Sequence, residues 1–329
     1  MANHDITDPT YNPSLRMFET SDPVHADVYN AVADQLINND VAIRNGVGLS
    51  DLEEYAASIK FMIQLDNGPA VIPLANALEI IVPANAGARN AIYGGRYLGD
   101  HVTDEQWAEI KSGTFRGMLI GDYWTIGGVN WRIAAFDYWY HYGDTECTKH
   151  HIVIVPDTNL LAGDGSTTHW MNKTDITTGA YVGSDFYTGN NGNTGKAQCR
   201  TKAQNAFGAA HILTHREHLQ NAVTNGYESA GTWYDSDIEI MTERMVYGCD
   251  IFHNVIHGTN IPNFYSIDTS QLPLFALDHS RICNRAYWWL RDVASATNFA
   301  NVNNNGNCNY NGASNAWEGV RPISYSPAK

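Results

Sequence analysis

The sequence predicts an α+β protein in which a loop-rich domain of short strands follows a helical and extended N-terminal region. Two observations support this prediction: helical periodicity is confined to a few segments, and many short apolar runs are separated by turn residues, with no repeat at a fixed period. The chain has 329 residues and is 43% hydrophobic, so it can bury a large core and form more than one domain.

Composition excludes several classes of function. The net charge of −15 disfavours a nucleic-acid binder, which would need basic residues to follow phosphates. No apolar run is long enough to cross a bilayer, and the first residues lack the features of a secretory signal, so we expect synthesis in the cytoplasm without membrane insertion. The five cysteines form no CxxC pair, so they indicate neither a zinc cage nor a full disulfide framework. No P-loop or GxGxxG motif appears, and we expect no metal and no cofactor.

The first region, residues 1–112, is predicted to be helical and extended, without a large core of its own. A helix is expected over residues 21–46, where Val28, Val32 and Leu36 form one apolar stripe. This stripe packs either on another copy of the chain or on the second domain, and a homotrimer is the favoured oligomer. We also expect a helix over residues 49–65, an extended segment, and a short helix capped by Thr103.

The second region, residues 113–329, is predicted to be the loop-rich domain of short strands. Its expected elements are a strand–turn–strand unit over 117–139 with the turn at Gly127–Gly128, a strand over 149–157, a helix with an irregular middle over 196–226, a short strand or helix over 236–248, and an extended segment over 270–278.

Histidines and carboxylates supply the catalytic and metal-binding candidates. His211 and His215 lie four residues apart, a helical spacing that can hold zinc with His218 nearby, but Ile212 stands where metalloproteases have glutamate. Packed histidines are therefore the favoured interpretation. Alternation along a strand separates His150 from His151, and nothing marks Asp237, Glu239 and Glu243 as an acid–base pair. We expect that the protein is not an enzyme.

An asparagine-rich stretch near the end of the chain is the best functional clue. Nine asparagines fall between Asn298 and Asn315. Asn305–Gly306 predicts a hairpin turn, and Asn311–Gly312 predicts a possible second one. We expect Phe299 and Val302 to point inward while the asparagines face water. A solvated, turn-rich loop explains the polarity of this stretch but not its density of asparagine.

The residue types of this stretch show a second regularity, which concerns the codons that could encode them. If the two adenines of an asparagine codon are replaced at random, the codon never encodes stop, Lys, Gln, Met, Trp or Glu. Every residue from Asp292 to Ala316 lies inside the reachable set, and Trp317 and Glu318 fall outside it. The pattern fits adenine-directed mutation.

"YWWLRDVASATNFANV" and "GASNAWEGVRP" resemble the variable region of proteins that are diversified by retroelements. Together with "GDYWTIGGVNWRI", "HHIVIVPD" and "SQLPLFALD", they resemble a C-type-lectin-like domain of the formylglycine-generating-enzyme variety, common in phages and prophages of gut bacteria. The resemblance covers Thr114 to Ile323 and implies that residues 113–329 form a ligand-binding domain. The N-terminal region more distantly resembles phage structural proteins, which implies that residues 1–112 serve virion attachment or oligomerisation.

The resemblance implies a receptor-binding or virion-surface adhesin, assembled in the bacterial cytoplasm, that binds a host cell-surface protein or glycan. The variable region would span about 287–322. The implied ligand face comprises Asn298, Asn301, Asn303, Asn305, Asn307, Asn309, Tyr310, Asn311 and Asn315. The implied scaffold comprises Trp288, Trp289, Leu290, Arg291, Gly319, Val320, Arg321 and Pro322.

Two departures limit what the resemblance implies. The calcium-binding motif of sugar-binding C-type lectins is missing, and neither Cys283 nor Cys308 matches the catalytic cysteines of formylglycine-generating enzymes. A structural decoration protein without a ligand, or an enzyme on the same fold, remain the alternatives. For the core we expect Trp124 and Trp131 to be buried with Trp288, Trp289 and Leu290, and Arg291 to pair with a carboxylate or backbone carbonyls.

Overall fold

The computed structural model describes residues 60–65, 68–73, 81–165, 169–189, 195–221, 223–224, 227–228, 231–253 and 270–327. The chain divides into two compact units between Pro83 and Ala84. Residues 84–112 therefore belong to the second unit, although the sequence suggested that they belong to the N-terminal region. The predicted helix over 21–46, whose stripe suggested a trimer, lies outside the described residues.

The described part of the first unit is an antiparallel hairpin of β1 (Lys60–Leu65) and β2 (Gly68–Pro73). The predicted helix over 49–65 is therefore wrong for its last six residues. Phe61 and Ile63 favour a strand, and the apolar segment that follows along the chain supplies a partner for it.

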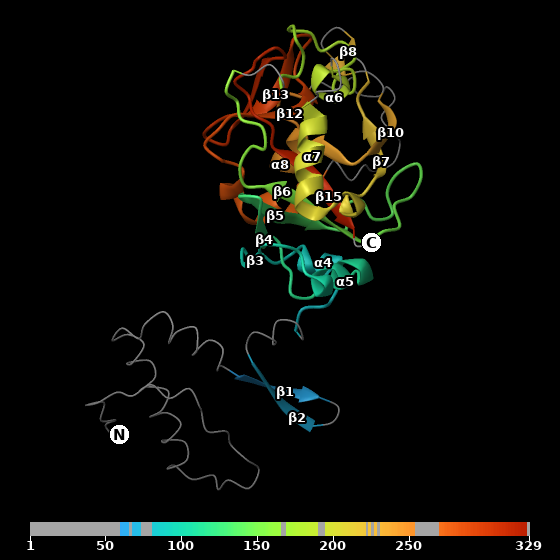
Figure 1. The fold of residues 1–329 in the computed structure, drawn as a ribbon, viewed down its shortest axis with the longest axis vertical. Coiled ribbons are helices and arrows are strands. Elements are labelled where there is room, and N and C mark those ends of the chain that lie inside the picture. The colour runs from blue at the N-terminus through green and yellow to red at the C-terminus, as the bar shows by residue number, and fades with distance from the viewer. Residues whose placement is uncertain are drawn as a thin grey trace, which may run out of the picture. The chain divides into compact units, whose positions relative to one another are not determined.

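A six-stranded sheet forms the centre of the second unit, in the order β11-β15-β6-β5-β4-β3 (Figure 1). All neighbouring strands are antiparallel except β3 and β4. The strands are β3 (Tyr97–Gly99), β4 (Tyr123–Ile126), β5 (Val129–Phe136), β6 (His151–Pro156), β11 (Ile238–Ile240) and β15 (Pro322–Pro327).

Two predicted features of this sheet are confirmed. Gly127 and Gly128 join β4 to β5, with φ angles of 60° and 77° that suit a tight hairpin turn. All six residues of β6 are buried, as expected for a central strand.

Helices and two-stranded sheets surround the central sheet. The helices are α4 (Ala86–Arg89), α5 (Asp104–Ser112), α6 (Asp185–Thr188), α7 (Gly195–Phe207), α8 (Glu243–Tyr247) and α9 (Pro273–Leu277), with the 3₁₀ turns η2 (Ala209–His211) and η4 (His279–Arg281). The strand pairs are β7 (His215–Leu219) with β10 (Thr232–Ser236), and β8 (Val223–Thr224) with β9 (Tyr227–Glu228). Thr103 caps α5 through a capping box, as predicted.

Two segments differ from the prediction. The helix expected over 196–226 ends at Phe207, because Gly208 turns the backbone to a φ of 85°, and residues 215–219 form a strand with alternating burial. The segment 270–278, expected to be extended, contains α9 instead. Pro273 suits the first turn of that helix, and tertiary packing buries the two residues that follow it.

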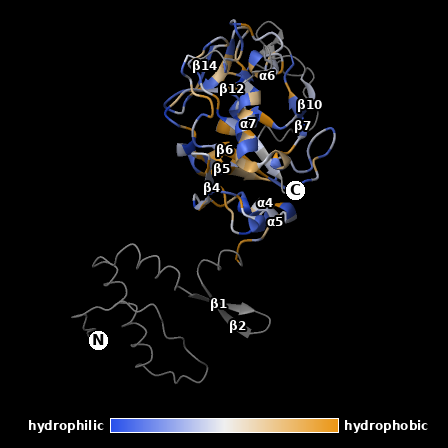
Figure 2. Cartoon of the chain, in the orientation of Figure 1, coloured by the Kyte–Doolittle hydropathy of each residue, from blue (hydrophilic) through white to orange (hydrophobic). Residues whose placement is uncertain are grey.

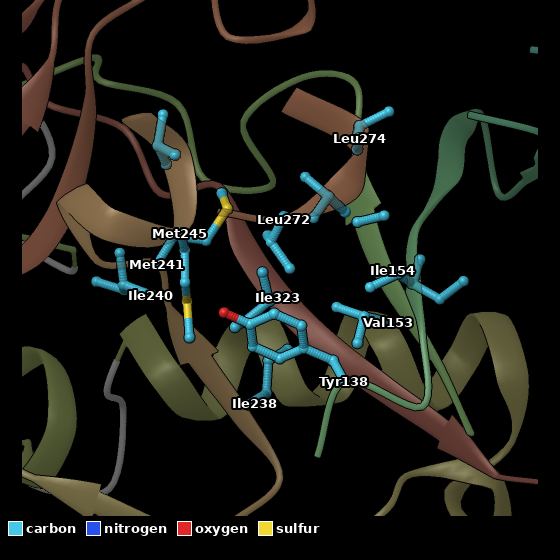
Figure 3. Packing of buried hydrophobic residues seen from close by; sticks show 14 of the residues in the cluster. Tyr138, Val153, Ile154, Ile238, Ile240, Met241, Met245, Leu272, Leu274 and Ile323 are labelled. Atoms are coloured by element: carbon cyan, nitrogen blue, oxygen red, sulfur yellow. The ribbon is translucent and has the colours of Figure 1, made fainter. Parts of the chain in front are cut away.

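One part of the core lies between the central sheet and the α8–α9 region, and α7 contributes Cys199, Ala203 and Phe207 to the same cluster. Figure 3 shows Ile154 of β6 and Ile323 of β15 beside Met245 of α8 and Leu272. Apolar colour gathers on β5 and β6 in Figure 2. The five core side chains named in the sequence analysis are at most 2% exposed, which confirms that prediction. In this core, β12 (Trp288–Val293) adjoins both α8 and β11.

Candidate ligand-binding surface

The asparagine-rich stretch forms part of a three-stranded antiparallel sheet in the order β12-β13-β14. Strand β13 spans Asn298–Val302 and β14 spans Cys308–Gly312. The outer edge of β12 is occupied, because the amides of Trp289 and Arg291 donate to Gly319 and Met241. Strand β14 therefore forms the other edge of this sheet.

The turn between β13 and β14 is the Asn305–Gly306 turn that the sequence predicts. Gly306 has a φ of 85°, and its amide donates to the carbonyl of Asn303. The Asn303 side chain accepts from the amides of Asn305 and Asn307 at 2.9 and 3.0 Å. The second predicted turn is wrong, because Asn311–Gly312 lies inside β14.

Exposure divides the predicted ligand face. Asn305, Asn307, Asn309 and Tyr310 are exposed, as is Asn304, and Tyr310 is 47% exposed. Asn298, Asn303, Asn311 and Asn315 are half-buried. Phe299 and Val302 are buried as predicted, but Asn301 is only 1% exposed, so the prediction that it faces water is wrong.

The burial of Asn301 has a simple geometric cause: both faces of β13 are covered. Because side chains alternate along a strand, Phe299 and Asn301 share one face, while Ala300 and Val302 share the other. The single exposed face that the sequence suggested does not exist on this strand. Exposed side chains gather instead at the turn and on β14.

The face that carries Asn301 is covered by Glu318. The side-chain amides of Asn301 and Asn311 both donate to Glu318 Oε1, each at 3.0 Å. Burial raises the pKa of Glu318 to about 7, and the hydrogen bond from Asn311 opposes this rise. Glu318 was not among the predicted site residues. Glu318 follows closely on the stretch that ends at Ala316, and glutamate cannot arise from an asparagine codon by adenine mutation. These two features are the signal that could have identified it.

The opposite face is covered by Glu243 and the loop after α8. Glu243 accepts backbone hydrogen bonds from residues 251–253 and a thiol hydrogen bond from Cys308 at 3.2 Å. The loop places the Phe252 ring edge-on to Tyr310, with ring centroids 4.9 Å apart. Phe252, which lies outside the asparagine-rich stretch, therefore contacts the exposed aromatic ring of β14, and the sequence did not indicate this contact.

The open edge of β14 is partly closed by its own asparagines. The Asn309 side chain accepts from the amide of Tyr310, and the Asn311 side chain accepts from the amide of Gly312, both at 2.9 Å. These bonds occupy donors that would otherwise be available to a second strand.

The predicted scaffold residues form the buried frame of the sheet. All six residues of β12 are buried, and Arg291 Nη1 lies 2.5 Å from Glu217 Oε1, which confirms the predicted carboxylate partner. Arg321 donates to the carbonyls of Pro156 and Arg281 at 2.7 and 2.8 Å. Gly319 and Val320 are buried, as is Pro322 in β15.

The histidine candidates do not form a metal site. His211, His215 and His218 lie in three ring pairs with different tryptophans, Trp107, Trp139 and Trp233. They do not share a helix, because His215 and His218 lie in β7. In the described part of the chain, no group of three or more His, Cys, Asp and Glu side chains is placed to hold a metal ion.

The remaining candidates also have separate partners. His150 Nδ1 lies 2.7 Å from Asp137, while the amide of Trp139 donates to His151 Nε2. Glu239 accepts hydrogen bonds from Lys196, Tyr181 and Ser236, Asp237 pairs with Arg200, and Glu243 covers β14.

Comparison with known proteins identifies one related domain. Residues 255–325 match a domain of unknown function (DUF6273), and this match contains all three strands of the sheet that carries the asparagines. No curated protein and no solved structure matches the chain. None of the helices in the described ranges is long and apolar enough to span a membrane.

Proposed function

We propose that this protein is a ligand-binding adhesin, displayed on the surface of a phage virion, whose β13–β14 hairpin contacts a protein or glycan on the host cell. In this proposal the second unit has a C-type-lectin-like fold of the formylglycine-generating-enzyme variety. The hairpin varies through adenine-directed mutation, and the protein carries out no catalysis.

The observation that supports the proposal is the unequal burial of the three strands. Strand β12 is entirely buried and β13 nearly so, whereas Asn309 and Tyr310 of β14 are exposed together with Asn305 and Asn307 beside the turn. Exposed substitutions usually change stability by less than about 1 kcal/mol. These positions can therefore vary while the frame stays folded, as antibody loops do.

The exposed surface has features suited to modest, adjustable affinity. Asparagine side chains offer both donors and acceptors, and Tyr310 supplies a large ring of the kind that dominates binding energy at interfaces. A hairpin with Tyr310 as its exposed aromatic and several amides favours weak binding by a single copy. Display of several copies, with a trimer favoured, would raise the apparent affinity through avidity.

Binding of labelled protein to a panel of gut bacterial strains tests this function. The wild-type protein is compared with a variant that carries alanine at Asn305, Asn307, Asn309 and Tyr310. The control is Lys111→Ala, an exposed position at the end of α5, which lies at the other end of the second unit from β13 in Figure 1.

We expect the wild-type protein and the control to bind at least one strain, and the hairpin variant to lose at least tenfold in affinity while its circular dichroism spectrum stays unchanged. Equal binding by the hairpin variant would show that the hairpin is not the binding site.

A further inference from the structure

Residues 313–318 form a loop that packs against the β13–β14 hairpin. The loop is held from the other side, because the carbonyls of Ala313 and Ala316 accept from the amides of Asn172 and Gly165. Asp175 accepts from both the amide and the hydroxyl of Ser314. Glu318 is the last residue of this loop and is 1% exposed, although Trp317 before it is 68% exposed.

Glu318 joins the loop to two neighbouring strands through a single oxygen. Its Oε1 accepts from Asn301 of β13 and from Asn311 of β14, each at 3.0 Å. In the described structure, Glu318 Oε2 and Asn301 Oδ1 are buried without a hydrogen-bond partner. An ionised carboxylate has no hydrogen to donate, so the neutral acid suits this environment better.

The charged groups of the neighbouring elements interact elsewhere. Arg291 of β12 pairs with Glu217, and Asp175 binds Ser314. His169 donates to the carbonyl of Ala316 and lies 4.0 Å from Asp164. Among the residues that the structure describes, no cation is therefore seen to compensate a charge on Glu318.

The two sides of this contact differ in whether adenine-directed mutation could produce their residue types. Asn301 and Asn311 lie inside the stretch compatible with adenine mutation, whereas a glutamate cannot arise from such a codon. The carboxyl group is thus constant, and its partners are asparagines.

We propose that Glu318 is a constant anchor that holds the β13–β14 hairpin in place, and that Asn301 and Asn311 are anchor positions rather than ligand contacts. The division between anchor and contact positions rests on the proposed function. The anchor itself is a property of the free protein and can be measured without a ligand.

The anchor has a characteristic dependence on pH. The pKa of Glu318 in the folded protein, about 7, is above the ordinary value of 4.5. Because the folded state then binds the proton more tightly than the unfolded state, the stabilisation is fully present below about pH 4.5 and is lost as the pH rises through about 7. Glutamine at this position keeps the neutral shape and removes the titration.

Thermal unfolding of the full chain at about pH 5 and about pH 8.5 tests the proposal. We expect Glu318→Gln to raise the Tm relative to wild type at the higher pH, and to bring a smaller gain or a loss at the lower pH. We also expect Asn301→Ala to lower the Tm, whereas the exposed control Asn305→Ala leaves it unchanged. The anchor is overturned if the Tm difference between Glu318→Gln and wild type is the same at both pH values, or if Asn301→Ala is as stable as Asn305→Ala.

Hydrogen exchange of the wild-type protein gives a second readout should Glu318→Gln not fold. After correction for intrinsic exchange rates, protection of β13–β14 should fall more than that of β5–β6 between about pH 5.5 and about pH 8. An equal change in both would overturn the proposal. Neither experiment involves host cells, so failure of the anchor and failure of the proposed function are separate results.

Discussion

Asparagine plays several structural roles within this one hairpin. Asn303 organises the turn, Asn301 and Asn311 bind Glu318, and Asn309 covers a neighbouring amide, while Asn305 points into solvent. The sequence pattern predicted one exposed patch because it could not distinguish these roles. What separates Asn301 from its neighbours is a carboxyl group 17 residues away in the chain, and only the fold reveals that contact.

Cys308 provides a test of the contact with Glu243. Burial raises the pKa of the Cys308 thiol, and the Glu243 carboxyl group beside it raises that pKa further. Because the thiolate is the reactive form, iodoacetamide at about pH 8 should label the exposed Cys249 well before Cys308. Peptide mapping by mass spectrometry measures both rates. Labelling of Cys308 at the rate of Cys249 would contradict the buried contact.

Arg291 should be important for stability because its partner is buried. Burial raises the pKa of Glu217, but the Arg291 charge and the hydrogen bonds from His215 and Arg291 outweigh this and lower the pKa to about 2. Arg291→Ala leaves that carboxylate without its cation and should cost about 3–5 kcal/mol at neutral pH, measured by urea unfolding.

Arg216, which precedes Glu217 in β7, offers a matched control for this substitution. It pairs with Asp144 and Asp235 at the surface, so Arg216→Ala should cost no more than about 1 kcal/mol. Equal losses for the two alanine variants would contradict the greater importance of the buried Arg291–Glu217 pair for stability.

Some turns and a helix cap that depend on adjacent residues were predicted correctly, whereas several elements that depend on tertiary contacts were not. The Gly127–Gly128 and Asn305–Gly306 turns and the cap of α5 were all correct, because each depends on a few adjacent residues. Residues 60–65 and 215–219 were predicted to be helical, but each pairs with a strand that local sequence does not reveal. Residues 273–277, predicted to be extended, form a helix whose Leu274 and Phe275 are buried.

Adding a methyl group at Gly306, in the turn of the β13–β14 hairpin, should lower the stability of the fold. Alanine at Gly306 would bring left-handed strain of about 1–2 kcal/mol, and its Cβ would lie only 2.9 Å from Cys283 Cβ. Gly128→Ala carries a similar strain, but its Cβ would meet no atom within 4 Å. Thermal unfolding should therefore show a larger loss for Gly306→Ala than for Gly128→Ala. Equal losses would mean that the turn is not packed against Cys283.

At the scale of the whole molecule, the second unit combines a buried centre with an edge where exposed asparagines gather. The central sheet and β12 contain the buried side chains Trp124, Trp131, Trp288 and Trp289, whereas the asparagines lie in and beside β13 and β14. The sequence correctly predicted buried tryptophans beside a polar hairpin. Trimer formation through the predicted helix stays a prediction, because that segment lies outside the described residues.

A library that varies only Asn305, Asn307, Asn309 and Tyr310 tests the central claim most directly. Each member is scored for folding by resistance to protease and for binding across the panel of bacterial strains. The proposed function predicts that most members fold and that the set of strains bound changes among them, with Glu318 and the scaffold kept constant. A library in which most members unfold, or in which folded members never change their binding, would contradict the assignment of this hairpin as the ligand-binding surface.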